Sequence, residues 1–336
     1  MSLTVRWLAI ILLIPVLILL GLTTGELTIS VSDVWNYIFS INNNEQSFLI
    51  LSQFRIPRVF VALFSGVAIS LSGLILQSIF RNPLAGPHVL GITSGAMLGA
   101  ALFILGFSWL FVDMVNGYQY GLLFSSFIGA FAMLMVILFI SSRIQQQVTV
   151  LVAGLLAGTG ISAIIDLLQY SAENQSLKSF VTWSMGSFTR VQPNFIAPFA
   201  FIVIILSLVS WLLSKPLNAL MLGEENALII GIKAKKVQTL AFIITGLLVA
   251  ITTALCGPLA FVGIIVPHLA RLYFNTANHR ILIPASAVIG ANVLLLADAL
   301  ATGTIFGMSV PVNTVSSLMA IPVIFYLLFS RRYIVV

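Results

Sequence analysis

The sequence predicts an all-α polytopic membrane protein with about ten transmembrane helices, arranged as a single transmembrane domain over residues 1–336. Hydrophobic residues make up 60% of the chain and charged residues only 7%. A soluble globular protein is instead about half apolar and about a quarter charged. Apolar blocks of roughly 17 to 25 residues, the length that crosses the hydrocarbon as a helix, recur along the whole chain. The protein is therefore expected to lie in a lipid bilayer.

The predicted spans follow one another with short polar connections. They cover Trp7–Leu22, Val59–Phe80, Val89–Phe107, Tyr120–Ser141, Val148–Tyr170, Asn194–Leu213, Val237–Cys256, Leu259–Phe274, Ile281–Ala301 and Val310–Phe329. No A-x-A-like cleavage site follows the first block, so we predict an anchored helix there and not a signal peptide. The stretch CGPLAFVGIIVPHLAR has glycines and prolines at positions 257, 258, 263 and 267, which favours a bent or broken helix.

Two further patterns concern packing and loops. The strings GITSGAMLG and GLLAG place glycines four residues apart, a spacing that predicts close helix packing in preference to a ligand site. The longer loops are Thr23–Gln53, in which SVSDVWNYIF predicts a short interfacial helix, and Ser171–Arg190. Neither loop is long enough to form a separate domain.

The positive charges predict the orientation. With a cytoplasmic N-terminus and an even number of spans, both termini are cytoplasmic, and the inner side receives eleven of the fifteen Lys and Arg residues. The inner set is Arg6, Arg81, Arg143, Lys215, Lys233, Lys235, Lys236, Arg271, Arg280, Arg331 and Arg332, and the outer set is Arg55, Arg58, Lys178 and Arg190. The net charge of +6 follows from this topology, so we predict no nucleic-acid partner.

The longest predicted cytoplasmic connection, Leu217–Gln238, concentrates charge in the string LGEENALIIGIKAKKVQ. Its apolar positions at i, i+7, i+8 and i+11 predict one helix with an apolar side; they are Leu220, Ala227, Leu228 and Gly231. Glu224 and Glu225 come early, where acids complement the helix dipole, and Gly231 is a predicted stop. Such a helix either lies on lipid headgroups or docks a cytoplasmic partner.

Several function classes are disfavoured. The three histidines are scattered and the single Cys256 cannot form an intramolecular disulfide, so we predict no catalytic residue, no resident metal and no cofactor in this chain. Only Asp166 and Asp298 are acids within the spans, and an ion-coupled secondary transporter is seldom built from so few groups. No G-x-x-x-x-G-K-[ST] phosphate loop is present, so any ATP hydrolysis must come from another polypeptide.

Five strings together resemble the FecCD family, the membrane permeases of ABC importers for iron-siderophores, haem and vitamin B12. They are RIPR (55–58), SGLILQSIFRNPLAGPHVLGITSGAMLG (72–99), LGEENALIIGI (222–232), GPLAFVGIIVPHLAR (257–271) and HRILIPASAVIGANVLLLADALA (279–301). The chain departs from the family pattern at three positions. Asn313 and Ala320 replace glycines that are usual there, and Thr302 stands where some relatives carry an arginine.

The resemblance implies a type II ABC importer permease with ten helices, similar to the vitamin B12 permease, in a bacterial cytoplasmic membrane. It implies a dimer with a second permease subunit, identical or paralogous, around a central pathway. It also implies two cytoplasmic ATPase subunits, which hold the ATP and Mg, and an extracytoplasmic substrate-binding protein. The largest part of the family carries iron-siderophores, which is the cargo we expect; haem and cobalamin are the alternatives.

The resemblance also implies roles for particular residues. Arg55 and Arg58 would dock the binding protein, and we expect glutamate at both positions to leave the permease folded. The ATPase would dock on the segment at about 217–236, at Gly223, Glu224, Glu225, Ala227, Leu228 and Gly231. The translocation pathway or its gate would include Gln146, Gln147 and Asp166; for Asp166 the alternative is a structural pairing within the subunit.

Overall fold

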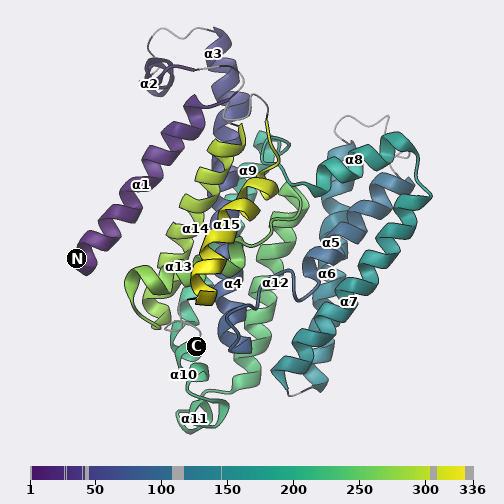
Figure 1. Ribbon diagram of the computed structural model, residues 1–336, viewed down its shortest axis with the longest axis vertical. Helices are drawn as coiled ribbons and strands as arrows, with labels where there is room; N and C mark the ends of the chain where they lie inside the picture. The colour runs from purple at the N-terminus through teal and green to yellow at the C-terminus, as the bar shows by residue number, and fades with distance from the viewer. Residues whose placement is uncertain are drawn as a thin grey trace.

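The computed structural model describes residues 2–329 except 26, 28, 40, 42–44, 108–116, 145 and 303–308, and helices form most of that part of the chain (Figure 1). Arg331 and Arg332 of the predicted inner set lie outside the described residues. The helices are α1 (Leu3–Thr23), α2 (Val31–Phe39), α3 (Glu45–Ile50), η1 (Leu51–Arg55), α4 (Ile56–Phe80), α5 (Ile92–Ala101), η2 (Leu102–Phe107), α6 (Gly117–Arg143), α7 (Gln147–Tyr170), α8 (Asn174–Ser184), α9 (Pro193–Leu212), α10 (Ser214–Met221), α11 (Glu224–Ile229), α12 (Ala234–Cys256), α13 (Val262–Phe274), α14 (His279–Thr302) and α15 (Val312–Phe329).

The prediction of about ten membrane helices is confirmed. Within the described residues, seven helical stretches are long and apolar enough to cross a membrane: α1, the continuous stretch from α3 to α4, α6, α7, α9, α12 and α14. Three shorter apolar helices, α5 with η2, α13 and α15, complete the set. Each predicted apolar block overlaps one of these ten stretches. The short helix predicted in the first long loop is α2, where Ser30 and Asp33 cap one another's backbone N–H groups at 3.2 Å.

Helix α4 forms the centre of the bundle and is buried along nearly its whole length. It packs against α14, α12, α13 and α9. Two of its glycines make the closest approaches: a methyl group at Gly66 would overlap the carbonyl oxygen of Gly290, and one at Gly73 would overlap that of Gly263. Backbones can come this near only where no side chain separates them.

The predicted glycine stripes also serve helix packing. A methyl group at Gly95 would lie 2.7 Å from the Cβ of Met133 in α6. One at Gly91 would lie 3.0 Å from the carbonyl oxygen of Gly154 in α7. The four-residue spacing therefore sets the contacts of α5 with α6 and α7, as the packing interpretation predicts.

We expect Gly73→Ala to lower the thermal stability of the purified protein, because the methyl group would force α4 away from α13. Overpacking of this kind costs about 1–3 kcal/mol. Gly160→Ala in α7 is the matched control, since nothing lies within 4 Å of its added methyl group. Equal melting temperatures for the two variants would contradict the close contact.

The predicted broken helix is confirmed between α12 and α13. The chain leaves helical geometry at Gly257 (φ +76°) and resumes it after Phe261 (φ +63°). Polar groups from other elements bind the freed backbone: His88 lies 2.8 Å from the carbonyl of Leu259, and Asn313 accepts a hydrogen bond from the N–H of Ala260 at 2.9 Å. Asn313, a departure from the family pattern, thus closes one bond that a glycine could not. Pro267 lies within α13 and does not end it.

The two ends of the bundle differ. Helices α10 and α11 project at one end, and α2, α3 and α8 lie at or near the other (Figure 1). We call these the α11 end and the α2 end. The cytoplasmic position of the α11 end stays a prediction from the distribution of charge.

Candidate functional site

The predicted coupling segment contains two helices, not one. Gly223, at φ +115°, separates α10 from α11, and that conformation is unfavourable for residues with a side chain. The predicted apolar side is therefore divided: Leu220 and Ala227 are buried, whereas Leu228 is exposed. Ala227 belongs to the inner surface of α11 and cannot reach a partner directly. The periodicity argument was wrong here because it assumed an uninterrupted helix.

The ends of α11 agree with the sequence prediction. Glu224 and Glu225 occupy the first turn, where their charge complements the helix dipole. At the other end, Gly231 adopts φ +81°. Its N–H donates to the carbonyl of Leu228 at 2.9 Å, and the N–H of Ile232 donates to that of Ala227 at 2.8 Å. This pair of bonds is a Schellman motif, which terminates the helix at the predicted glycine.

The residues before α11 and at its C-terminal end expose large apolar side chains, beside the exposed Glu224, Glu225 and Asn226 of its first turn. We define the α11 tip as Leu222, Leu228, Ile229 and Ile230, whose exposed fractions are 71%, 65%, 81% and 62%. Helix α11 lies at the extreme end of the bundle (Figure 1). Large exposed apolar side chains grouped on a projecting helix favour an interaction site.

A buried hydrogen-bond chain anchors α10 to the bundle. The Oδ1 atom of Asn218 accepts from the backbone N–H of His279 at 2.9 Å and lies 2.7 Å from its Nδ1. An amide oxygen can only accept, so Nδ1 carries a proton. In the neutral ring Nε2 then accepts, and Ser78 Oγ lies 2.6 Å from it. The chain Ser78–His279–Asn218 thus links α4 and α14 to the coupling segment.

One predicted gate residue, Gln147, lies beside the coupling segment. Arg81 donates to the carbonyl of Leu220 at 2.7 Å, and Gln238 donates to Glu224 at 2.9 Å. A cavity of about 550 Å³ lies between these groups, and Gln147 forms part of its wall. The neighbouring Gln146 is the residue before α7 and is exposed.

Asp166 lies at the opposite end of α7, about 28 Å from Gln147 at 1.5 Å per residue. The structure therefore does not gather the three predicted pathway residues into one cluster. Asp166 belongs instead to an exposed stripe with alternating spacings of four and three: Val148, Val152, Leu155, Thr159, Ser162 and Asp166. The stripe is apolar towards the α11 end and polar towards the α2 end.

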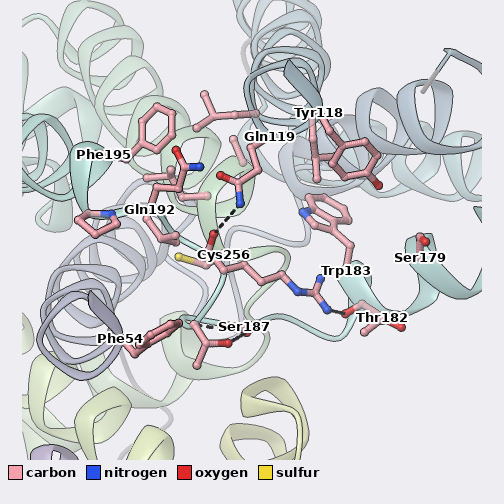
Figure 2. A pocket seen from close by; sticks show the side chains of 18 of the residues that line it. Phe54, Tyr118, Gln119, Ser179, Thr182, Trp183, Ser187, Gln192, Phe195 and Cys256 are labelled. Carbon is pink, nitrogen blue, oxygen red and sulfur yellow. Dashed lines mark hydrogen bonds between the residues drawn. The ribbon is translucent and has the colours of Figure 1, made fainter. Parts of the chain in front are cut away.

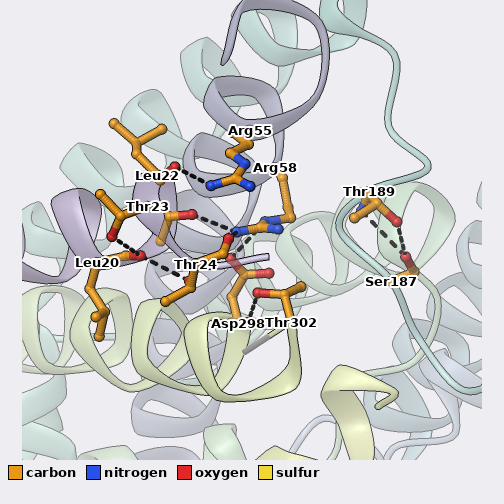
Figure 3. Close-up of polar contacts among 11 residues, drawn as sticks. Leu20, Leu22, Thr23, Thr24, Arg55, Arg58, Ser187, Thr189, Asp298 and Thr302 are labelled. Atoms are coloured by element: carbon orange, nitrogen blue, oxygen red, sulfur yellow. Dashed lines mark hydrogen bonds and ion pairs between the residues drawn. The ribbon is translucent and has the colours of Figure 1, made fainter. Parts of the chain in front are cut away.

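Arg55 and Arg58, the predicted docking pair, are both buried, with exposed fractions of 4% and 5%. Arg55 donates to the backbone carbonyls of Leu22, at 2.6 Å, and Leu27 (Figure 3). Arg58 donates to the carbonyl of Gly21 at 2.6 Å. Both guanidinium groups therefore bind the carbonyls at the C-terminal end of α1, where a helix has unpaired acceptors and partial negative charge.

Arg58 also forms an ion pair with Asp298, with 3.0 Å between Nε and Oδ2 (Figure 3). The pair joins α4 to α14, and Asp298 is 1% exposed. The alignment is that of an ion pair and not of a hydrogen bond, and no described donor bonds Oδ1. The sequence analysis did not give Asp298 this role. The available signal was an acid within a span, which is expected to pair with a cation.

The docking role of the two arginines stays a prediction. In this single subunit their donors point at α1 and α14, so a binding protein would meet them only after a rearrangement. The expectation that glutamate at both positions leaves the fold intact does not fit this geometry, because a carboxylate introduced in place of Arg58 would face Asp298 in a buried site.

The described part of the chain is a helical bundle of ten apolar stretches with a short helix projecting from one end, which is the architecture of a polytopic membrane permease. A model of the FecCD transport family matches residues 11–330. The chain belongs to this family and is an ABC importer permease subunit of a bacterial type, a multi-pass protein of the inner membrane.

Its relatives differ in cargo. The chain is 32% identical to the molybdate import system permease protein MolB of Haemophilus influenzae, covering 97% of this chain and 95% of that one. It is 31% identical to the hemin transport system permease protein HmuU of Yersinia pestis (96% and 95%). It is 32% identical to the vitamin B12 import system permease protein BtuC of Citrobacter koseri (98% and 95%).

The fold has a solved counterpart. An inward-facing structure of a metal-chelate type ABC transporter superposes with a TM-score of 0.84 at 30% identity, over 97% of this chain and 99% of that one. PsaBC from Streptococcus pneumoniae in complex with Fab shares the fold at a TM-score of 0.59 and 18% identity.

Proposed function

We propose that this chain imports an iron-siderophore or a similar iron chelate, as one of two permease subunits that stand on two ATPase subunits and receive cargo from an external binding protein. The observation that carries the proposal is the α11 tip. It is apolar and exposed, and the Ser78–His279–Asn218 chain ties the adjoining α10 to α4 and α14. A segment that couples an ATPase to the membrane helices needs such a connection.

The exposed stripe of α7 supports a pathway beside a second permease subunit. A carboxylate at Asp166 is unfavourable against lipid, and so is expected to face water or protein. Thr159 and Ser162 share its side of the helix. In a dimer these groups would line the shared pathway near the α2 end, which is the predicted outer side, whereas Gln147 lies near the ATPase side.

We expect Asp166→Cys to react with a membrane-impermeant maleimide added from outside, in a background in which Ser replaces Cys256. The control is Ile165→Cys, because Ile165 is 3% exposed. Labelling of the variant at position 166 should be about tenfold faster or more, since thiol reagents of this type attack from water. Equal protection of both positions in every transport state would argue against a pathway position.

The proposed cargo is an iron chelate. The metal-chelate description of the solved counterpart supports an iron chelate, while the named relatives carry molybdate, hemin and vitamin B12. Proteoliposomes containing the permease with its ATPase and binding protein would decide. We expect ATP-dependent uptake of a labelled ferric siderophore that excess haem, cobalamin or molybdate does not inhibit. Uptake without ATP would indicate an ion-coupled transporter instead.

A further inference from the structure

A cavity of about 610 Å³ opens near the α2 end, between α8, the start of α6, η1 and the end of α12 (Figure 2). Its wall contains two cations, Lys178 and Arg190, and no acid among the described residues. The rest of the polar wall consists of amide and hydroxyl side chains, which include Gln119, Gln192 and Thr182. Phe54 and Tyr118 contribute exposed aromatic surface.

These two cations are the predicted outer positive charges that form no ion pair within the described residues. Of the four predicted outer cations, Arg55 and Arg58 bind α1 and Asp298. Within the described residues, neither Lys178 nor Arg190 has a carboxylate within 4.0 Å. Positive charge is disfavoured on the outer side of a membrane protein, so two unpaired cations on one cavity wall call for a ligand.

Arg190 is held at the wall. One of its Nη atoms donates to the carbonyl of Thr182 at 3.1 Å, and its own carbonyl accepts from Gln119 at 3.5 Å. A guanidinium has five N–H donors, so donors remain for a ligand. Partial burial lowers the pKa of Arg190, a cost that a nearby anion would offset.

We propose that this cavity binds a phosphate-bearing anion, supplied by the headgroup of an anionic phospholipid in the outer leaflet. A fork of guanidinium donors with a nearby ammonium matches phosphate oxygens, and the volume is within the usual range for small-ligand sites, about 300–1,000 Å³. The position favours a lipid. The cavity lies where α6 and α9 begin, and an exposed tyrosine such as Tyr118 is typical of the membrane interface.

The test is native mass spectrometry of the purified full-length protein exchanged into phosphatidylglycerol, with phosphatidylcholine as the uncharged comparison. The variant Lys178→Gln with Arg190→Gln should retain phosphatidylglycerol about tenfold more weakly, because two charge-assisted contacts are lost. Lys178→Arg with Arg190→Lys keeps both charges and should retain it. Lys215→Gln with Arg280→Gln removes the same charge at the α11 end and should leave this lipid bound.

Inorganic phosphate distinguishes the two sources of the anion. If phosphate displaces phosphatidylglycerol from the wild type and not from the Gln variant, the cavity binds phosphate groups, and free phosphate competes with the lipid for it. If phosphate has no effect while the Gln variant loses the lipid, the headgroup is the ligand. Equal phosphatidylglycerol retention by the wild type and the Gln variant, or equal retention of the two lipids by the wild type, would overturn the proposal.

Discussion

Replacing Leu228 and Ile229 with glutamate is expected to abolish ATP hydrolysis coupled to transport while leaving the permease folded. Both side chains are more than 60% exposed, so the change costs the isolated subunit little. In a complex the two apolar side chains would be buried, and each contributes about 1.5–3 kcal/mol to such an interface. Two desolvated carboxylates would add a further penalty. Binding of the ATPase should weaken by about a hundredfold or more.

Co-purification of the ATPase with the tagged permease, and the ratio of ATP hydrolysed to substrate moved, measure this effect. A matched control places the same charges on exposed apolar positions of the α2 end, Val31→Glu with Ile38→Glu, whose exposed fractions are 55% and 57%. That variant should keep its ATPase. If the α11 tip instead lies on lipid headgroups, the Leu228 and Ile229 variant will copurify normally and the assignment of the tip is wrong.

A substitution at Ala227 is a poor test of docking, because this residue is buried in the permease itself. A bulky charged residue at this fully buried position would disturb the packing of α11 on α10 and α12, so loss of coupling would not identify a docking surface. Glutamate at Leu228 leaves that packing intact. The two outcomes can be separated because Ala227 is buried and its neighbour Leu228 is exposed on the same short helix.

The spans were predictable because uninterrupted apolar length is a local property, which hydrocarbon thickness alone constrains. The stop at Gly231 was predictable for the same reason, since a left-handed C-terminal residue favours glycine at one position. The break at Gly223 was not, because glycine is also tolerated inside helices. Only the structure shows that Gly223 separates α10 from α11 and that Gly231 ends α11.

The arginine cluster could not be assigned from the sequence because its partners are distant along the chain. Arg58 and Asp298 are 240 residues apart. The other acceptors are backbone carbonyls of α1, which every residue type has, so the sequence does not show which of them are used. The distribution of charge predicted that both arginines lie on the outer side of the membrane. The family resemblance implied that they dock the binding protein. The pairing of an intramembrane acid with a cation was the one physical rule that pointed elsewhere.

The last prediction concerns this ion pair. Arg58→Ala and Asp298→Ala should each destabilise the permease by about 3–5 kcal/mol, because each leaves one buried charge without its partner. The combined variant Arg58→Met with Asp298→Leu should recover most of that loss, since removing both charges removes the desolvation cost as well. The single Cys256, 2% exposed, allows the measurement: a thiol-reactive fluorophore labels it faster as the bundle unfolds on heating.

The combined variant also separates structure from docking. If Arg58 serves only to join α4 to α14 and the end of α1, the recovered protein will be stimulated by the binding protein as the wild type is. If Arg58 receives an acidic residue of the binding protein, stability will recover and stimulation will not, and docking will lose its dependence on salt. Should Arg58→Ala melt at the wild-type temperature, the ion pair contributes nothing to the fold, and the burial of Arg58 then needs another cause.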